Sequence, residues 1–193
     1  MRKVVGGLFI TVDGVVESPD QWSFDLFDED FGAHMGTVLA ATDTMLLGRN
    51  TYAEWVDYWP TSTDEPFAGH INSVRKYVVS DTLDEVGWTN ASLLRGADLA
   101  TTLADLKRQP GNTIGTAGSP TLVRRLLEAD LLDELELMIY PVVAGKGARL
   151  FTDNGLLHRL DLVDTTRTGS GIVINTYRPG LIDPRGRLPD HHE

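Results

Sequence analysis

Hydrophobic positions along this chain alternate between runs of strand length and segments of helical periodicity, beginning at its first residues. The apolar run "KVVGGLFITV" has the length of a buried strand, and "FDEDFGAHMGTVLAA" follows it. In the second segment the apolar side chains recur on one helical face, namely those of Phe27, Phe31, Met35, Val38 and Leu39. The pattern predicts a strand and then a helix. "TMLLG" repeats it with a second short strand, and a helix from about Asn50 follows.

The middle of the chain continues this alternation. "DEPFAGHINSV" predicts a short helix and "RKYVVS" a third strand, with further short strands expected near Trp88 and in "ASLLRG". A helix over "DLATTLADLKRQPG" ends at a Pro-Gly pair, and "NTIGT" predicts the next strand. Ser119 followed by Pro120 then predicts a helix start, because the hydroxyl can cap free amides and proline is tolerated at the first helical position.

The last part of the chain changes to antiparallel strands. "DELELMIYPVVAG" alternates Leu135, Leu137 and Ile139 with Glu136 and Met138, as a half-buried strand does. "LHRLDLVDTTRTGSGIVINTYRP" then predicts a hairpin across "TGSG". The whole pattern predicts an α/β fold of three layers, α/β/α, with a mixed, mostly parallel sheet and an antiparallel C-terminal hairpin. We expect one domain over residues 1–179 and a polar tail over residues 180–193.

Composition narrows the classes of function. The 193 residues carry a net charge of −11 and the basic residues are scattered, which disfavours binding to nucleic-acid phosphates. No uninterrupted apolar stretch reaches the length of a membrane span. The absence of cysteine excludes thiol nucleophiles, disulfides and iron–sulfur clusters, and is compatible with a reducing cytoplasm, where we expect the protein.

Two strand-to-helix junctions carry the candidate chemistry. Ligands of open α/β sheets bind beyond the carboxyl ends of the strands, where helix N-termini present free amides. Gly48 permits a tight turn, Arg49 can hold a phosphate through paired hydrogen bonds, and Thr51 can cap the helix or donate to the same anion. In "GTAGSPT", residues 115–121, small side chains permit a pyrophosphate to approach the backbone. Neither junction is a formal nucleotide motif, and each is also compatible with a plain turn and a structural cap.

Three segments together resemble a known family. They are "GRNTY" after an apolar strand, "YVVS" as a later strand, and "GSPTLVRRLLEADLLDELELMIYPVVAGKGARLF". In this order they resemble the dihydrofolate reductase-like family, and within it the reductase domain of bacterial riboflavin biosynthesis, as a stand-alone member. The resemblance covers about residues 1–179 and implies a fold that binds NADPH across the strand ends. It also implies hydride transfer to a small heterocyclic or imine-like substrate, and a homodimer.

The resemblance implies a cofactor site built from four segments of the chain. Its residues are Val12 beside the nicotinamide, Gly48, Arg49, Asn50 and Thr51 near the phosphates, Ser80 near the adenosine ribose, and Thr116, Ala117, Gly118 and Ser119 under the pyrophosphate. Asp81 departs from the family pattern, because an acidic neighbour disfavours a 2′-phosphate. Arg49 favours NADPH, which is the expected cofactor, with NADH as the alternative.

The catalytic acid is the least defined part of this site. Asp13 follows the first strand and is a candidate polar residue at the mouth of the cofactor site, but it can equally stabilise an Asp-Gly turn. The resemblance implies an acidic residue on the first helix, a region that holds Asp25, Asp28, Glu29 and Asp30 with no unique match. Each of these carboxylates can also serve the N-terminus of that helix through its charge. The catalytic residue is therefore left unassigned, with Asp13 and Asp28 as weak candidates.

The substrate side has only weak candidates. Trp22 and Trp59 can wall a planar substrate by stacking, although aromatic side chains at such positions more often belong to the core. Lys146 and Arg149 can hold a substrate phosphate or can be solvated surface charges. The histidines have no paired metal-ligand spacing, so no metal site is expected.

Three functions are compatible with these residues. The leading hypothesis is an NADPH-dependent reductase resembling 5-amino-6-(5-phosphoribosylamino)uracil reductase of riboflavin biosynthesis. A reductase of the dihydropterin or dihydrofolate type, or one acting on an unrelated carbonyl, is the alternative within enzymes. A non-catalytic nucleotide-binding module that forms dimers is the alternative of another class, and the missing unique acid motivates it.

Overall fold

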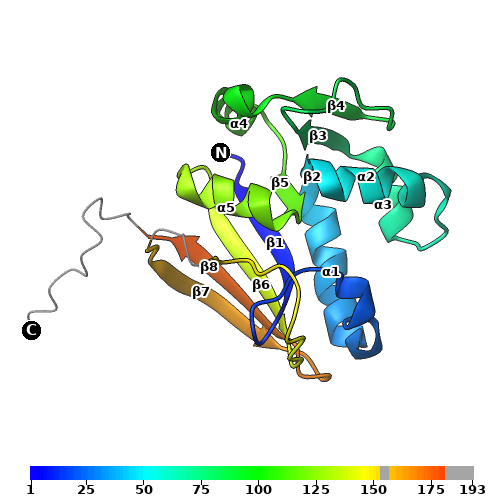
Figure 1. Cartoon of the computed structure of the whole chain (residues 1–193), viewed down its shortest axis with the longest axis vertical. Helices are drawn as coiled ribbons and strands as arrows, with labels where there is room; N and C mark the ends of the chain where they lie inside the picture. Colours follow the sequence, from blue (N-terminus) through cyan, green and yellow to red (C-terminus); the bar gives the residue numbers. More distant parts are fainter. Residues whose placement is uncertain (153–156, 181–193) are drawn as a thin grey trace, which may run out of the picture.

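An eight-stranded sheet forms the middle layer of the molecule. The computed structural model describes residues 1–152 and 157–180, and its strands lie in the order β4-β3-β2-β5-β1-β6-β8-β7 (Figure 1). Pairing is parallel from β4 to β6 and antiparallel from β6 through β8 to β7. The strands are β1 (Val4–Thr11), β2 (Thr42–Gly48), β3 (Arg75–Val79), β4 (Ala91–Leu94), β5 (Thr113–Ala117), β6 (Glu134–Tyr140), β7 (Leu160–Arg167) and β8 (Val173–Pro179). The predicted mixed sheet with an antiparallel C-terminal hairpin is confirmed.

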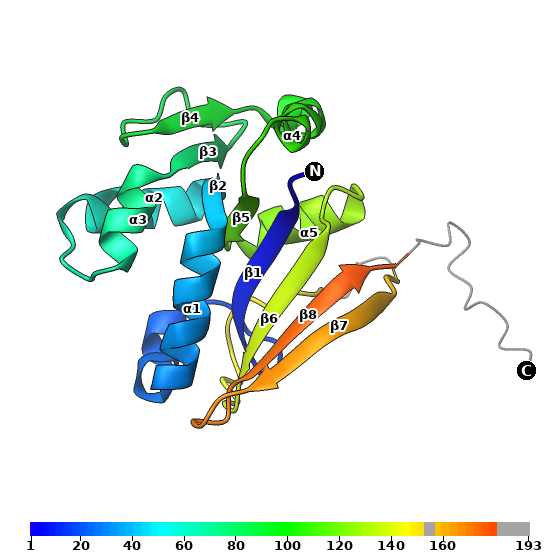
Figure 2. The same cartoon turned by 180° about the vertical axis from the view of Figure 1, so that it is seen from behind.

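Helices cover both faces of this sheet. They are α1 (Glu29–Ala41), α2 (Arg49–Tyr58), α3 (Phe67–Ser73), α4 (Leu99–Arg108) and α5 (Pro120–Glu128). Helix α5 crosses the sheet in Figure 1, and α1 lies on the opposite face, as the reversed view in Figure 2 shows. The predicted three layers are therefore confirmed, whereas the predicted tail lies outside the described residues beyond Gly180. None of the helices within the described ranges has the length and apolar character needed to cross a bilayer.

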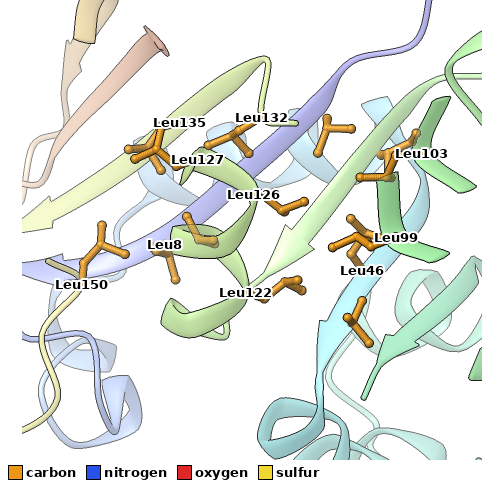
Figure 3. Packing of buried hydrophobic residues seen from close by; sticks show 14 of the residues in the cluster. Leu8, Leu46, Leu99, Leu103, Leu122, Leu126, Leu127, Leu132, Leu135 and Leu150 are labelled. Carbon is orange, nitrogen blue, oxygen red and sulfur yellow. The ribbon is translucent and has the colours of Figure 1, made fainter. Parts of the chain in front are cut away.

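Helix α5 is held in place by its apolar stripe. Its buried residues are Leu122, Val123, Leu126 and Leu127, which is the spacing of one helical face. They pack with leucines of β1, β2, β6 and α4 in one cluster (Figure 3). Ser119 accepts a hydrogen bond from the Leu122 amide, so the predicted cap is confirmed. This packing fixes the β5–α5 loop at the carboxyl edge of the sheet.

Local boundaries differ from the prediction at three points. Trp88 belongs to no strand and lies in the turn before β4, where its buried indole donates to Asn72 Oδ1 at 3.0 Å. Helix α2 begins at Arg49, one residue earlier than predicted. Phe27 precedes α1 because Asp28 caps that helix and accepts from the Phe31 amide. At Trp88 and at Phe27 the deciding contact is made by a side chain.

Lys76, near the start of β3, is fully buried. Its ammonium donates to the carbonyls of Asn72, Val74 and Thr89 at 3.2, 2.9 and 3.2 Å, and lies 4.6 Å from the centroid of the Trp88 ring. Burial nevertheless lowers the pKa of Lys76 to about 8, because desolvation disfavours the charged form. The folded chain therefore loses this proton at a lower pH than the unfolded chain does.

We expect the free energy of unfolding to rise between pH 8 and pH 10. In that range the unfolded chain keeps the Lys76 proton and the folded chain has released it, so stability increases with pH, by about 1–2 kcal/mol. Urea unfolding at several pH values measures the rise. Lys76→Met should remove it, whereas Lys146→Met, which changes an exposed lysine, should keep it. A wild-type profile that is flat across this range would contradict the prediction.

Candidate functional site

The predicted cofactor residues meet at one edge of the sheet. Strands β1 to β6 are parallel, so their carboxyl ends lie together, at the place where open α/β sheets bind ligands. Along this edge Ser80 follows β3, Gly48 ends β2, Ser119 lies just beyond β5, and Val12 follows β1. Val12 is 63% exposed there. The fold thus gathers segments that are far apart in the sequence.

The β2–α2 and β5–α5 junctions are in direct contact. A Cβ atom added at Gly48 would lie 2.7 Å from both Cβ and Oγ of Ser119, closer than such atoms approach in proteins. Gly48 is extended, with φ −76° and ψ 161°, so the close approach and not the backbone conformation requires glycine here. Two helix N-termini consequently open onto the same stretch of the edge.

The first turn of α2 has no side-chain cap. Gly48 is its N-cap residue, and Arg49, Asn50 and Thr51 are the first three helical residues. Thr51 lies too far into the helix to cap it, and its Oγ1 would be 3.7 Å from a Cβ at Gly118. Arg49 and Asn50 are exposed, and no hydrogen bond or ion pair engages the Arg49 guanidinium among the described residues. Free amides and a free guanidinium at a helix N-terminus suit an anion.

The β5–α5 loop presents backbone groups, more than side chains, to a ligand at the edge of the sheet. Thr116 is 7% exposed, and its buried hydroxyl has no partner within the described ranges. Ala117 packs against the hydrophobic cluster of β2, α2 and α3. Gly118 has φ +74°, in the left-handed region that favours glycine, and a cis peptide joins it to Ser119. The Ser119 hydroxyl is engaged as the cap of α5, so a ligand here would meet amides.

Ser80 is turned inward at the end of β3. It is 6% exposed, and its hydroxyl accepts hydrogen bonds from the amides of Thr82 and Leu83 at 3.2 and 3.1 Å. Arg95, which follows β4, donates to the Ser80 carbonyl at 3.0 Å. The serine hydroxyl therefore shapes the turn that carries Asp81. Contact between this turn and a ribose would come from the exposed residues next to Ser80.

Asp13 anchors one loop to another. It accepts hydrogen bonds from the Thr11 hydroxyl at 2.7 Å and from the amides of Ala144 and Gly145 at 3.0 and 2.9 Å, and Arg149 lies 3.8 Å away. The Thr11 hydroxyl and these amides lower the pKa of Asp13 to about 2. A carboxylate so well supplied with donors stays ionised at neutral pH, which suits an anchor better than a proton donor.

Asp28 likewise connects two segments, the N-terminus of α1 and the turn between β7 and β8. Its Oδ1 caps α1 through the Phe31 amide at 2.8 Å, and its Oδ2 accepts from the Ser170 amide in the β7–β8 turn at 2.6 Å. The Phe31 amide, followed by the donors at Ser170, lowers the pKa of Asp28. Asp30 binds the neighbouring Gly169 amide at 3.0 Å. Both sequence candidates for the catalytic acid thus already hold structural hydrogen bonds.

The substrate candidates are divided between two regions. Trp22 packs edge-on against Tyr140 at 5.3 Å between ring centroids, while Trp59 belongs to a separate cluster with Trp55. The two tryptophans therefore do not face each other across one site. Trp22 does line a hollow of about 450 Å³ formed by residues 20–25 and Val142, beyond the ends of β1 and β6. Lys146 is exposed on the loop that Asp13 anchors.

Tyr140 and Arg125 were not singled out by the sequence. Tyr140 ends β6 with its hydroxyl buried, and burial raises its pKa, so the hydroxyl stays protonated. Arg125 reaches from α5 to the end of β4 and donates to Gly96 O at 2.9 Å. The one local signal for Tyr140 was the proline that follows it at the end of the strand. The contact of Arg125 has no local signal.

No cluster of three histidine, aspartate or glutamate side chains that could hold a metal ion occurs in residues 1–152 and 157–180. His34 does meet Glu136 at 3.1 Å, but as a pair between α1 and β6. At the β2 and β5 ends of the carboxyl edge the exposed groups are backbone amides, the Arg49 guanidinium and small side chains. Such a set has the chemistry to bind an anionic ligand.

Comparisons with known proteins agree with this architecture. The family model described as the RibD C-terminal domain matches residues 2–174. The uncharacterized protein YyaP of Bacillus subtilis is 30% identical over 181 residues, which cover 91% of this chain and 94% of YyaP.

Solved structures share the fold at low sequence identity. A putative riboflavin biosynthesis protein from Shewanella sp. PV-4 has a TM-score of 0.70 at 20% identity, covering 93% of this chain and 99% of that one. A dihydrofolate reductase from Enterococcus faecalis, complexed with NADP(H), has a TM-score of 0.57 at 12% identity, covering 92% of this chain and 96% of that one. The predicted resemblance to the dihydrofolate reductase-like fold is confirmed.

Proposed function

Because this chain belongs to the RibD C-terminal domain family, we propose that it is a reductase that takes a hydride from a nicotinamide cofactor. The expected cofactor is NADPH, with NADH as the alternative. The acceptor is a small heterocycle, an imine or a carbonyl, as in the reduction of 5-amino-6-(5-phosphoribosylamino)uracil. The observation that carries the proposal is the contact between Gly48 and Ser119, because it opens two helix N-termini onto one anion site.

The residues at the edge fit a dinucleotide. The amides of residues 49–51 and 118–119 would hold the pyrophosphate, and Arg49 would add a charge-assisted hydrogen bond to a phosphate. Val12, the residue after β1, would support the nicotinamide, which supplies the hydride when bound. The hollow beside Trp22 would receive the substrate, and the exposed Lys146 would meet a substrate phosphate. The chain itself would contribute positioning and exclusion of water.

A non-catalytic nucleotide-binding module is the second candidate. The observation that favours it is the engagement of both Asp13 and Asp28 in structural hydrogen bonds, which leaves no free carboxylic acid among the predicted candidates. A cofactor cleft without a proton donor would bind nucleotide and not turn over. The two candidates therefore make the same prediction about binding and opposite predictions about turnover.

Cofactor titration tests both candidates. Adding NADPH and then NADH to the protein should change nicotinamide fluorescence and raise the melting temperature, because a ligand of the folded state stabilises it. Oxidation of the bound cofactor on a panel of pterin and pyrimidine substrates would support the reductase. Binding of cofactor without turnover on any of them would support the module, and binding of neither cofactor would refute both.

Arg49→Ala should weaken NADPH more than NADH. The loss is expected to be roughly 1–3 kcal/mol for NADPH, since a charge-assisted hydrogen bond to its 2′-phosphate, a group that NADH lacks, disappears. Fluorescence titration of each cofactor measures the difference. Arg75→Ala is the matched control, because Arg75 is also exposed but begins β3 at the opposite edge of the sheet. Equal losses for the two cofactors would contradict contact with the 2′-phosphate.

We also propose that the chain pairs into a homodimer. Strand β7 lies at the end of the sheet order, and its Leu162 and Val163 are 55% and 47% exposed. Exposed apolar side chains on an edge strand suit an interface with a second sheet. Light scattering is expected to give twice the chain mass, and a monomer mass would refute the pairing. A cytoplasmic location also remains our proposal.

A further inference from the structure

Three charged or polar groups are tied together where β3 and β4 end. Asp81 Oδ1 accepts a hydrogen bond from the Gly96 amide at 2.8 Å. Arg125 of α5 donates to the Gly96 carbonyl at 2.9 Å, and its Nη1 lies 3.9 Å from Asp81 Oδ2. We call this set the Asp81–Gly96–Arg125 latch. It connects the turn after β3, the end of β4 and helix α5.

The latch holds its two charges at the surface. A Cβ atom at Gly96 would overlap the Arg125 guanidinium, so this group rests directly against the glycine. The side chains of Arg125 and Asp81 are 46% and 63% exposed. The carboxylate therefore has a defined position and still faces solvent at the edge of the sheet. Its charge is only partly offset, because the Arg125 contact is long.

The latch lies where one end of a bound dinucleotide would come. If the pyrophosphate binds at the β2 and β5 junctions, the two nucleoside halves of the cofactor extend from it along the edge in opposite directions. Under the proposed function, on which this inference rests, the nicotinamide half extends toward β1. The other side is β3 and then β4, whose ends lie about 5 and 10 Å beyond β2 at the usual strand spacing. The adenosine ribose would therefore reach Asp81.

We infer that Asp81 sets the choice between NADPH and NADH. A fixed carboxylate can accept a hydrogen bond from a ribose 2′-hydroxyl, whereas it repels a 2′-phosphate. Arg125 lessens that repulsion from behind the carboxylate, and Arg49 attracts the phosphate from the neighbouring strand end. Asp81 and Arg125 thus act in opposite directions on selectivity. Asp81 brings the affinity for NADH close to that for NADPH.

Two substitutions of opposite sign test this inference. Asp81→Asn keeps an oxygen that can accept from the Gly96 amide and removes the charge, so the ratio of NADPH to NADH affinity should rise about 3- to 10-fold at low salt. Arg125→Gln leaves the carboxylate less compensated and should lower the same ratio about 3-fold. Asp84→Asn, which removes an exposed charge from the same loop, should leave the ratio unchanged.

The readout is the dissociation constant of each cofactor by fluorescence, at about 50 mM and about 500 mM salt. The effect of Asp81→Asn should shrink at the higher salt, because a charge this exposed is screened. A purely structural role for the latch would weaken NADPH and NADH together and leave the ratio unmoved, which would overturn the inference alone. Wild-type protein that binds neither cofactor would overturn the proposed function with it. Melting temperatures verify that each variant is folded.

Discussion

Replacing Gly48 by alanine is expected to weaken the binding of NADPH and NADH alike, by roughly 10- to 100-fold. The new Cβ would lie 2.7 Å from Cβ and Oγ of Ser119, so the β2–α2 and β5–α5 junctions would have to separate. Both junctions belong to the proposed pyrophosphate site, and the amides on the two sides would no longer converge. The extended backbone at Gly48 accepts alanine, so the effect is one of contact alone.

Two further variants separate this contact from general damage to the fold. Gly36→Ala places a methyl group in α1 where nothing lies within 4 Å, and it should leave binding intact and stabilise the helix by about 0.5–1 kcal/mol. Ser119→Gly removes the atoms that the methyl group introduced by Gly48→Ala would strike, so the double substitution should recover part of the lost affinity. Fluorescence titration and thermal melts measure both effects. Wild-type affinity in Gly48→Ala would show that the junctions do not form the cofactor site.

Asp43→Ala is expected to cost about 3 kcal/mol of stability without changing cofactor affinity. Asp43 forms an ion pair with Arg2, which is 8% exposed, and accepts from the Asn112 amide at 2.6 Å. The Arg2 guanidinium also donates to Asn112 O at 2.7 Å and to Thr44 Oγ1 at 2.8 Å. Without Asp43 this buried cation loses its counter-charge. The expected loss of stability is at the lower end of the range for broken buried ion pairs, because the Asp43 side chain is 37% exposed.

Thermal melting measures this loss as a fall of about 6–12 °C. The control is Asp105→Ala, which breaks an exposed pair with Arg108 within α4 and should cost less than about 1 kcal/mol. The contribution of Asp43 also depends on pH. Burial raises its pKa, but the hydrogen bonds from Asn112 and Thr44 and the charge of Arg2 outweigh burial and lower it. The stabilisation is therefore present above the usual aspartate pKa and disappears as the pH falls through the lowered value.

Asp43 and Gly48 lie at opposite edges of one sheet. Arg2, Asp43 and Asn112 precede or begin β1, β2 and β5 at the amino edge, whereas Gly48 and Ser119 lie at the carboxyl edge of β2 and β5. We expect a substitution at the amino edge to lower stability and leave cofactor binding intact, and one at the carboxyl edge to weaken binding. This result would show that residues at the amino edge stabilise the fold, whereas those at the carboxyl edge contact the ligand. Equal effects on both measurements in both variants would contradict this division.

Much of the fold could be predicted because its signals are local. Apolar periodicity marked nearly every helix and strand, Ser119 and Pro120 marked the start of α5, and the alternation in "ELELMIY" marked β6. Each of these signals depends on residues within one or two turns or along one strand. The predicted strand near Trp88 was wrong because a side chain outside the local pattern decided the structure there. The Trp88 indole is held by Asn72 of α3 and not by a strand.

The sequence by itself thus determined which segments form the elements, and that two junctions bearing Arg49 and Ser119 suit anions. Only the tertiary structure decided how these are used, because β5 inserts between β2 and β1 and thereby brings Gly48 against Ser119. It also decided that Asp13 binds amides 131 and 132 residues away, so that its carboxylate anchors a loop. The tertiary structure likewise brings Gly96 and Arg125 to Asp81. Hydrogen-bond partners so remote along the chain leave no periodic pattern, and only the folded sheet places them together.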